Sequence, residues 1–397
     1  MALFTGLVLP VAACGSSSSS SGGSSVTFTG QPIKLVVINN TSTTRENAEV
    51  YAGADAAAAA INDAGGINGR QLVIVHCASQ ITPDGTAKCA RDAVADPQVL
   101  ALAGSYYQYG DQVDPVLEQA KMANIGDFPQ AIQDLTSVIS FPTSSGALGT
   151  VAGMATLVTD VLKSLRISVP YVDVPEGTQV VQLLDGVLQT RPGASVVTKV
   201  PVPNNAPDLA ASVQASTQNN PGGIIIVLSA DANLKFLQTA HSQGVTIPIV
   251  SPGAEVTPSA LAALGDAANG QYVTTVFPPS GGQGNQLFAQ QMDKYQSSAP
   301  KDDLSKNSWL GVRLFQAAAA KATALTRQGI LDAMNGLTSF DTGGLTPPIN
   351  YTQPFTGFGG TFPRMFNPTV VYNKFTNGQE VPTNPGQFAN PFAPVGG

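Results

Sequence analysis

Charged residues are scarce in this chain, and clusters of basic residues are absent from it. Only 11% of the 397 residues are charged, and the formal net charge is −7. Nucleic-acid binding depends on clustered lysine and arginine, so we expect no nucleic-acid partner. Apolar residues make up 43% of the sequence. This composition excludes an intrinsically disordered chain and is typical of a soluble protein with enough apolar side chains for two domain cores.

Sequence motifs of the common enzyme classes are also missing. The chain has no Gly-x-Ser-x-Gly turn, no His-Glu-x-x-His motif and no phosphate-binding loop ending in Gly-Lys-Ser/Thr. The first predicted strand, 33–38, is not followed by Gly-x-Gly-x-x-Gly. His241 falls within a predicted helix, where we interpret it as a surface residue rather than a general base. We therefore expect a binding protein without catalytic activity, cofactor or metal.

The first of the three cysteines, Cys14, directly follows a short apolar run over residues 2–13. Small residues before such a cysteine are the pattern at which a bacterial signal peptidase cuts, after the thiol has received a diacylglycerol group. The run is shorter than the roughly 20 residues that a membrane span requires, and no other stretch of the chain qualifies as a span. The sequence thus predicts a signal peptide over 1–13 and a lipid-anchored, Ser/Gly-rich tether over 14–31.

A secretory signal normally carries Lys or Arg before its apolar core, whereas the first cationic residue here is Lys34. Either the true start lies upstream of Met1, or the apolar run is an ordinary N-terminal segment. We favour the first interpretation, because the serine tract over 15–25 has the composition of a flexible tether. The predicted location is the extracytoplasmic face of a bacterial cell membrane.

Cys77 and Cys89 remain once Cys14 is assigned to the lipid. Outside the cytoplasm such a pair is normally a disulfide, and a bridge closing this small loop contributes on the order of 3 kcal/mol. The alternative is a metal site that includes the adjacent His76. We disfavour the metal site, because no Cys-x-x-Cys spacing occurs and His241, the other histidine, is distant in sequence.

Apolar runs typical of buried strands alternate with helical patterns along the chain. Strands are predicted at 33–38, 72–77, 99–103, 124–126, 168–172, 195–200, 223–228 and 247–250. Helices are predicted at 46–64, around Cys89, and at 112–123, 146–166, 176–190, 208–219 and 231–244. Two alternating series of similar length predict an α/β fold of two doubly wound parallel-sheet lobes.

Ligands of such sheets bind beyond the carboxyl ends of the strands, so residues that follow predicted strands are the candidate site. Ser105, Tyr106, Tyr107 and Tyr109 follow the strand at 99–103. The tyrosines offer flat faces and hydroxyls to an apolar or ring-bearing ligand, and Ser105 can receive a carboxylate. The alternative is that these tyrosines pack between the lobe and the loop.

Five further candidates follow other strands: Phe128, Gln130, Glu176, Asp231 and Glu255. The three carboxylates belong to the second series and are suited to a ligand ammonium group. Asp231 is alternatively the N-cap of its own helix, which is the interpretation we favour. Glu176 is alternatively a first-turn partner of the helix dipole. Glu255 is the best placed of the three, because its loop has no obvious capping task.

Several stretches of the sequence are close to motifs of a known family. The most specific stretch is Ala59-Ala60-Ile61-Asn62-Asp63-Ala64-Gly65-Gly66-Ile67-Asn68-Gly69-Arg70, and further matches are Lys88-Cys89-Ala90-Arg91 and Ala267-Ala268-Asn269-Gly270. On these residues the chain resembles, over 32–325, the type I periplasmic-binding fold of the branched-chain amino-acid (Leu/Ile/Val) binding protein family. Members of that family are extracytoplasmic receptors of ABC importers.

The resemblance implies two lobes that trap a ligand, joined by three hinge crossovers near Pro142, Phe277 and Thr338. The implied boundaries are 32–142 plus 278–338 for lobe 1, 143–277 plus 339–381 for lobe 2, and 382–397 for a Pro/Gly/Asn-rich tail. The implied partners are the permease subunits of an ABC importer, and the protein is expected to be monomeric. A sensory receptor of the same fold is the alternative.

The resemblance also bears on the ligand. Small hydroxyl residues receive the amino-acid carboxylate in the family, and only Ser105 fits that pattern here, since tyrosines replace the neighbouring positions. The loop over 173–177, which usually carries a tyrosine, has no aromatic residue. The expected ligand is an amino acid or a related amide or aromatic solute.

Overall fold

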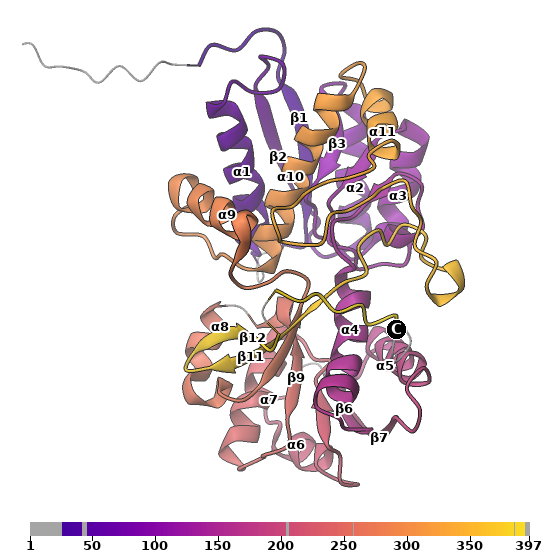
Figure 1. The fold of residues 1–397 in the computed structure, drawn as a ribbon, viewed down its shortest axis with the longest axis vertical. Helices are drawn as coiled ribbons and strands as arrows, with labels where there is room; N and C mark the ends of the chain where they lie inside the picture. Colours follow the sequence, from indigo (N-terminus) through magenta and orange to yellow (C-terminus); the bar gives the residue numbers. More distant parts are fainter. Residues whose placement is uncertain (1–25, 42–45, 204–205, 257, 385, 394–397) are drawn as a thin grey trace, which may run out of the picture.

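The computed structural model describes residues 26–41, 46–203, 206–256, 258–384 and 386–393. The predicted signal peptide, Cys14 and most of the predicted tether lie outside these ranges. The described chain forms two α/β lobes, one above the other along the long axis of the molecule (Figure 1), which confirms the predicted fold class. No helix of the described residues has the length and apolar composition that a membrane span requires.

The first lobe is built on a five-stranded parallel sheet in the order β2-β1-β3-β4-β5. Its strands are β1 Ile33–Asn39, β2 Leu72–Ala78, β3 Val99–Ala103, β4 Ala123–Ile125 and β5 Ser140–Phe141. β1 and β3 are apolar and buried along almost their whole length, because helices cover both faces of the sheet.

The helices of the first lobe pack closely on this sheet and on one another. They are α1 Ala48–Asp63, α2 Pro83–Ala95, α3 Gly110–Ala120, α9 Gly282–Tyr295, α10 Asp303–Lys321 and α11 Arg327–Asn335, with a short η1 at Gln133–Leu135. α2 begins where the Thr82 side chain accepts a hydrogen bond from the Gly85 N–H and Pro83 occupies the first turn. α1 approaches α10 so closely that a Cβ on Gly53 would lie 2.1 Å from the carbonyl oxygen of Ser305.

The second lobe contains a seven-stranded sheet in the order β12-β11-β10-β9-β8-β6-β7. Its strands are β6 Arg166–Val172, β7 Ser195–Val202, β8 Gly223–Ile225, β9 Ile249–Pro252, β10 Tyr272–Thr275, β11 Val371–Thr376 and β12 Gln379–Pro382. β6 to β10 are parallel, whereas β11 and β12 are antiparallel. The strand predicted at 223–228 is regular only over β8, Gly223–Ile225. Beyond β8, the Val227 N–H still donates to the Pro170 carbonyl of β6.

Helices of the second lobe surround this sheet. They are α4 Gly146–Thr156, α5 Pro175–Leu188, α6 Ala210–Ser216, α7 Ala230–Ser242 and α8 Pro258–Leu264, with short helices η2 Leu157–Val161, η3 Gly253–Glu255, η4 Gly265–Ala268 and η5 Phe358–Gly360. The predicted helix at 146–166 divides into α4 and η2, a π-helical turn. His241 is exposed at the end of α7, as the sequence predicted.

Three crossovers connect the lobes in the part of the chain that the structure describes. The first leaves β5 at Pro142, and the second leaves β10 and passes Phe277. The third was expected near Thr338 and instead lies at 367–370, directly before β11. The Asn367 side-chain amide donates to the Thr143 carbonyl over 3.0 Å and so ties the third crossover to the first.

The misplaced crossover has a packing explanation. Phe340 and Ile349 exchange two backbone hydrogen bonds, and both belong to the apolar core of the first lobe together with Leu345 and Tyr351. Residues 340–351 therefore pack with lobe 1, on the other side of the boundary expected at 339.

Candidate functional site

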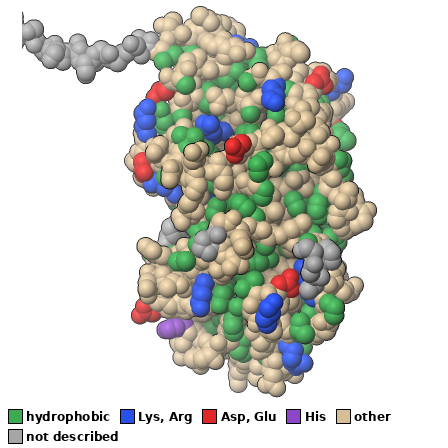
Figure 2. Space-filling model, viewed as in Figure 1, with side chains coloured by type: hydrophobic (Ala, Val, Ile, Leu, Met, Phe, Trp, Pro, Cys, Tyr) green, Lys and Arg blue, Asp and Glu red, His purple; other side chains and the backbone are tan. Residues whose placement is uncertain are grey.

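The carboxyl ends of the parallel strands in both sheets meet at the crossovers. β5 and β10 run directly into crossovers, and their parallel neighbours end at the same edges of their sheets (Figure 1). We call the region between these two edges the interlobe cleft. The space-filling view shows the surface indented on its left side between the lobes (Figure 2). Loops that follow strands are thus brought together at one place, as expected for a sheet of this class.

Glycines fix the floor of the cleft in the first lobe. Gly104 and Gly126 follow β3 and β4 with φ values of +71° and +62°. A Cβ on Gly104 would lie 2.5 Å from Ser308 Cα, and a Cβ on Gly126 would lie 2.4 Å from Gly311 Cα. Only glycine adopts the left-handed conformation easily and also leaves room for such a close approach. The glycines therefore allow α10 to lie directly against the ends of these strands.

Ser105 has a structural partner inside the first lobe. Its buried hydroxyl accepts a hydrogen bond from the Ile38 N–H over 3.1 Å, and the next residue extends the ladder to β1. The carboxylate-receiving role predicted for Ser105 therefore requires its hydroxyl to serve a second function.

Tyr107 is a core residue. Its side chain is 1% exposed and packs with Ile38, Cys89 and Val113 under α2 and α3. The Asn124 amide donates to the Tyr107 hydroxyl over 2.7 Å, and burial raises the pKa of that hydroxyl well above its usual value. Tyr107 thus packs inside the lobe, as the alternative interpretation stated, and we withdraw Tyr107 as a ligand contact.

Tyr106 and Phe128 are brought together beside the crossovers. Their rings meet edge to face with centroids 5.8 Å apart, and the Phe128 N–H donates to the Ser105 carbonyl. Both rings belong to the same apolar cluster as Phe277 of the second crossover. Both side chains are nearly buried, with Tyr106 6% and Phe128 5% exposed, so they are the part of the sequence-predicted set that packs nearest the crossovers.

Tyr109 and Gln130 occupy the rim of the same lobe. Both are half-buried, Tyr109 directly before α3 and Gln130 in the loop after β4. The loop is held by Asp134, whose Oδ2 accepts the N–H groups of Gln130 and Ala131, each over 2.9 Å.

Buried carboxyl groups under this loop were not foreseen from the sequence. Asp114, Asp127 and Asp134 are each at most 2% exposed. Burial raises the pKa of Asp134 to about 7, and burial and the neighbouring carboxyls raise the pKa of Asp114 and Asp127 well above the ordinary value. No pattern in the sequence distinguishes these aspartates from surface ones.

The second lobe separates its three predicted carboxylates. Asp231 is exposed in the first turn of α7, where Ser229 occupies the N-cap position, so the N-cap interpretation of Asp231 is wrong. Glu176 lies in the first turn of α5, but its side chain falls outside the described residues. Glu255 ends η3, a half-buried turn after β9 that lies against α10 of the first lobe.

A cavity of about 120 Å³ lies between α10 and the second lobe. Lys306, 4% exposed, donates to the carbonyl oxygen of Pro278 in the second crossover over 2.9 Å. Asp303 accepts the Val276 N–H, and Glu380 of β12 accepts from the Asn373 amide. Burial raises the pKa of Asp303 to about 6 and that of Glu380 to about 7. Charged groups thus line the joint between the lobes.

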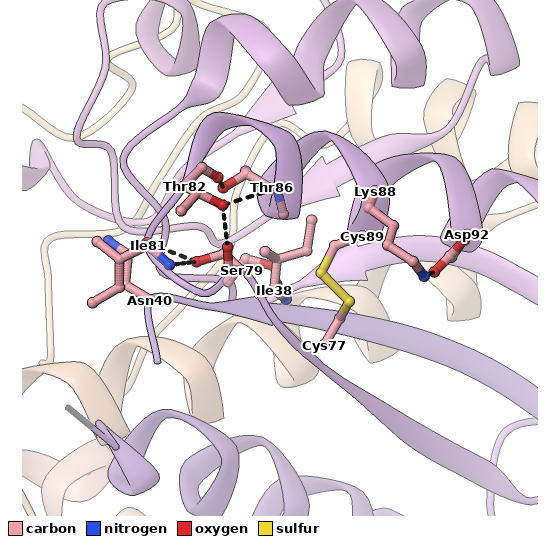
Figure 3. The surroundings of a disulfide bond; sticks show 12 residues. Ile38, Asn40, Cys77, Ser79, Ile81, Thr82, Thr86, Lys88, Cys89 and Asp92 are labelled. Carbon is pink, nitrogen blue, oxygen red and sulfur yellow. Dashed lines mark hydrogen bonds and ion pairs between the residues drawn. A yellow bond between two sulfur atoms is a disulfide. The ribbon is translucent and has the colours of Figure 1, made fainter. Parts of the chain in front are cut away.

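Two left-handed residues follow β2 at the edge of the cleft. Gln80 and Ile81 have φ values of 55° and 54°, a conformation that is costly for the β-branched Ile81. The Ile81 N–H donates to the Ser79 hydroxyl, which in turn donates to the Asn40 side chain after β1 (Figure 3). Strain of this kind concentrates at binding sites, and the sequence carries no signal for it.

The predicted disulfide between Cys77 and Cys89 is present and joins β2 to α2 (Figure 3). Because both sulfurs are bonded to each other, neither is a thiolate ligand for the metal site considered as the alternative. The adjacent His76 ring stacks on Tyr51 with centroids 4.0 Å apart, and its Nε2 lies 3.0 Å from Asp55 Oδ1.

A family model described as periplasmic binding protein matches residues 32–359. No curated protein matches the sequence. The fold is similar to that of an extracellular ligand-binding receptor from Verminephrobacter eiseniae ef01-2, with a TM-score of 0.76 and 18% identity over 88% of this chain and 99% of that one.

Two further solved structures have the same fold. A fatty acid ABC transporter substrate-binding protein from Thermomonospora curvata is 18% identical, with a TM-score of 0.77 over 92% of this chain and 94% of that one. A branched chain amino acid ABC transporter from Thermus thermophilus with bound valine is 16% identical, with a TM-score of 0.76 over 90% and 96%. At these identities the similarity establishes the fold alone.

Proposed function

Because the chain belongs to the periplasmic binding protein family, as its resemblance at the sequence level indicated, we propose that it is the solute-binding protein of an ABC importer. The observation that carries this proposal is the interlobe cleft, where the carboxyl ends of the parallel strands of both sheets face each other across the crossovers. A ligand that contacts both edges stabilises a closed arrangement of the lobes over an open one. The closed form would be the one that permease subunits recognise.

We infer that the ligand is an amino acid or a related small carboxylate with an apolar body. In this proposal Tyr106 and Phe128, 6% and 5% exposed, form the apolar side of the site, and the half-buried Tyr109 and Gln130 add polar groups from the same lobe. Glu255 is the second-lobe carboxylate best placed for a ligand ammonium group. Two proteins of similar fold fit this class, since the one from Thermomonospora curvata is named for fatty acid and the one from Thermus thermophilus holds valine.

The experiment is a thermal-shift screen of residues 26–397, which include every described element, against amino acids, amides, aromatic acids, fatty acids and sugars. Tyr106→Ala and Phe128→Ala should each weaken binding of any ligand found by tenfold or more, since each removes apolar contact area. Tyr295→Ala on α9 is the matched control and should bind normally. A ligand that binds both cleft variants as tightly as the parent protein would contradict the proposed site.

We also propose that the mature protein begins at Cys14, carries lipid there and stands clear of an outer membrane face on the tether over 14–31. The disulfide supports this location, because cysteine pairs persist as disulfides in oxidising compartments. Mass spectrometry of the membrane fraction should find a diacylglycerol-modified N-terminal Cys14. Unmodified protein that begins at Met1 would contradict the anchor and leave the cleft proposal intact.

A further inference from the structure

A second cavity lies on the first lobe, outside the interlobe cleft. Its volume is about 470 Å³, and it is bounded by α9, α10 and the segment 340–343. No residue of the loops that follow the strands lines it. A volume of this size falls within the range of pockets that hold small organic molecules.

Arg313 of α10 lines this cavity without a hydrogen-bonding or charged partner among the described residues. Its guanidinium carbon lies 5.1 Å from the centre of the Trp309 ring, and burial lowers the pKa of the half-buried group. Asp341 on the rim is exposed and accepts the Gly343 N–H instead.

The other arginines of the described chain that are buried or half-buried all have acceptors. Arg70, Arg191, Arg327 and Arg364 each donate to at least one backbone carbonyl. A cation partly removed from water and lacking such an acceptor is destabilised relative to one that has it. Arg313 therefore differs from them in having its hydrogen-bonding capacity unused beside an open cavity.

The remaining walls of the cavity combine apolar and polar residues. Leu287, Ala317, Ala320 and Phe340 supply apolar surface, and Gln283, Gln316 and Thr342 add polar side chains. Trp309 and Leu310, each 1% exposed, lie behind this lining. A guanidinium fork matches a carboxylate in geometry and charge, and the apolar walls match a hydrocarbon or ring. We propose that this cavity binds a small organic carboxylate, with Arg313 pairing to the carboxylate and Leu287 and Phe340 contacting its apolar body.

The chain contains a reporter for this proposal, because Trp309 is its only tryptophan. The full-length protein in detergent is titrated with 3-phenylpropionate while tryptophan fluorescence is recorded. We expect a saturable change, with 3-phenylpropan-1-ol, the uncharged analogue, binding at least tenfold more weakly. Arg313→Gln should weaken binding of the acid by tenfold or more, and Arg91→Gln, a change at an exposed arginine of α2, should not.

Two further variants distinguish binding in this cavity from a folding defect and from binding in the interlobe cleft. Ala320→Phe places a ring at the exposed rim of the cavity without changing its charge, and it should also abolish the response. Tyr106→Ala alters the cleft and should leave the response unchanged. The proposal is overturned by equal binding of acid and alcohol, by unchanged affinity in both cavity variants, by absence of a saturable response, or by a response lost only in Tyr106→Ala.

Discussion

At the scale of single residues, Gly311 determines how α10 meets the first sheet. A Cβ at this position would lie 2.6 Å from the Gly104 nitrogen, closer than real Cβ contacts. Gly311→Ala should therefore lower the free energy of unfolding by about 1–3 kcal/mol, even though alanine favours the helix. Gly186→Ala in α5 is the control, because a Cβ there meets no atom within 4 Å.

Denaturant unfolding of both variants measures the difference. Gly186→Ala should raise the free energy of unfolding by about 0.5–1 kcal/mol, which is the ordinary gain of alanine over glycine in a helix. A Gly311→Ala protein as stable as the Gly186→Ala protein would show that α10 does not need its close contact with Gly104.

Asp134 makes stability depend on pH through its buried carboxyl group. Its pKa is about 7 in the folded protein and close to 3.8 when unfolded, so unfolding releases a proton between these values. The free energy of unfolding should then fall as the pH rises from 4 to 7, with this group contributing up to about 1.4 kcal/mol per pH unit.

Asp134→Asn should flatten this pH dependence. The asparagine oxygen still accepts the two N–H groups that Oδ2 accepts, but the residue carries no charge at any pH. The measurement is urea unfolding at several pH values between 4 and 8, with Asp266→Asn, at an exposed position in η4, as the control. Equal slopes for the two variants would contradict the role assigned to Asp134.

The adjacent residues Tyr106 and Tyr107 show what the sequence leaves undetermined at this scale. Successive residues of an extended chain point to opposite faces, so one tyrosine packs toward the crossovers and the other toward α2 and α3. The sequence shows that a strand and Gly104 precede the two tyrosines. It does not show which tyrosine points to which face, because that is set by the pairing of Tyr106 with β1.

At the scale of elements, the disulfide ties α2 to β2. The Cys77–Cys89 bridge closes a loop with a sequence separation of 12, which in the chain-entropy model corresponds to about 3 kcal/mol. The double variant Cys77→Ala/Cys89→Ala should lose about that much unfolding free energy in denaturant titrations. Treating the parent protein with reductant should give the same loss, and a loss under about 0.5 kcal/mol in both cases would contradict the estimate.

Most elements were predictable because their local signals agree with their packing. Continuous apolar runs gave β1 and β3, and Thr82-Pro83 marks the start of α2. The β11–β12 hairpin was overlooked, although Asn377-Gly378 is a strong turn signal and both residues have positive φ. The two-residue β5 and the π-helical η2 depend on tertiary contacts, so no local pattern specifies them.

At the scale of the whole molecule, two doubly wound lobes followed from the alternation of strands and helices, and the antiparallel β11 and β12 of the second sheet did not. The position of the third crossover did not, because residues 340–351 carry no regular periodicity and are held by the side chains of the first core. The cleft was therefore predictable as a set of loops. The buried aspartates, the strained Ile81 and the position of Arg313 beside an open cavity were visible only once the chain was folded.

The central claim is that a ligand closes the two lobes over the interlobe cleft. Small-angle X-ray scattering of residues 26–397 tests it most directly, with and without a saturating concentration of a ligand found in the thermal-shift screen. A closing molecule should show a smaller radius of gyration with ligand, and the Tyr106→Ala variant should show no decrease at the same ligand concentration. An unchanged radius of gyration in the parent protein at saturation would contradict the claim.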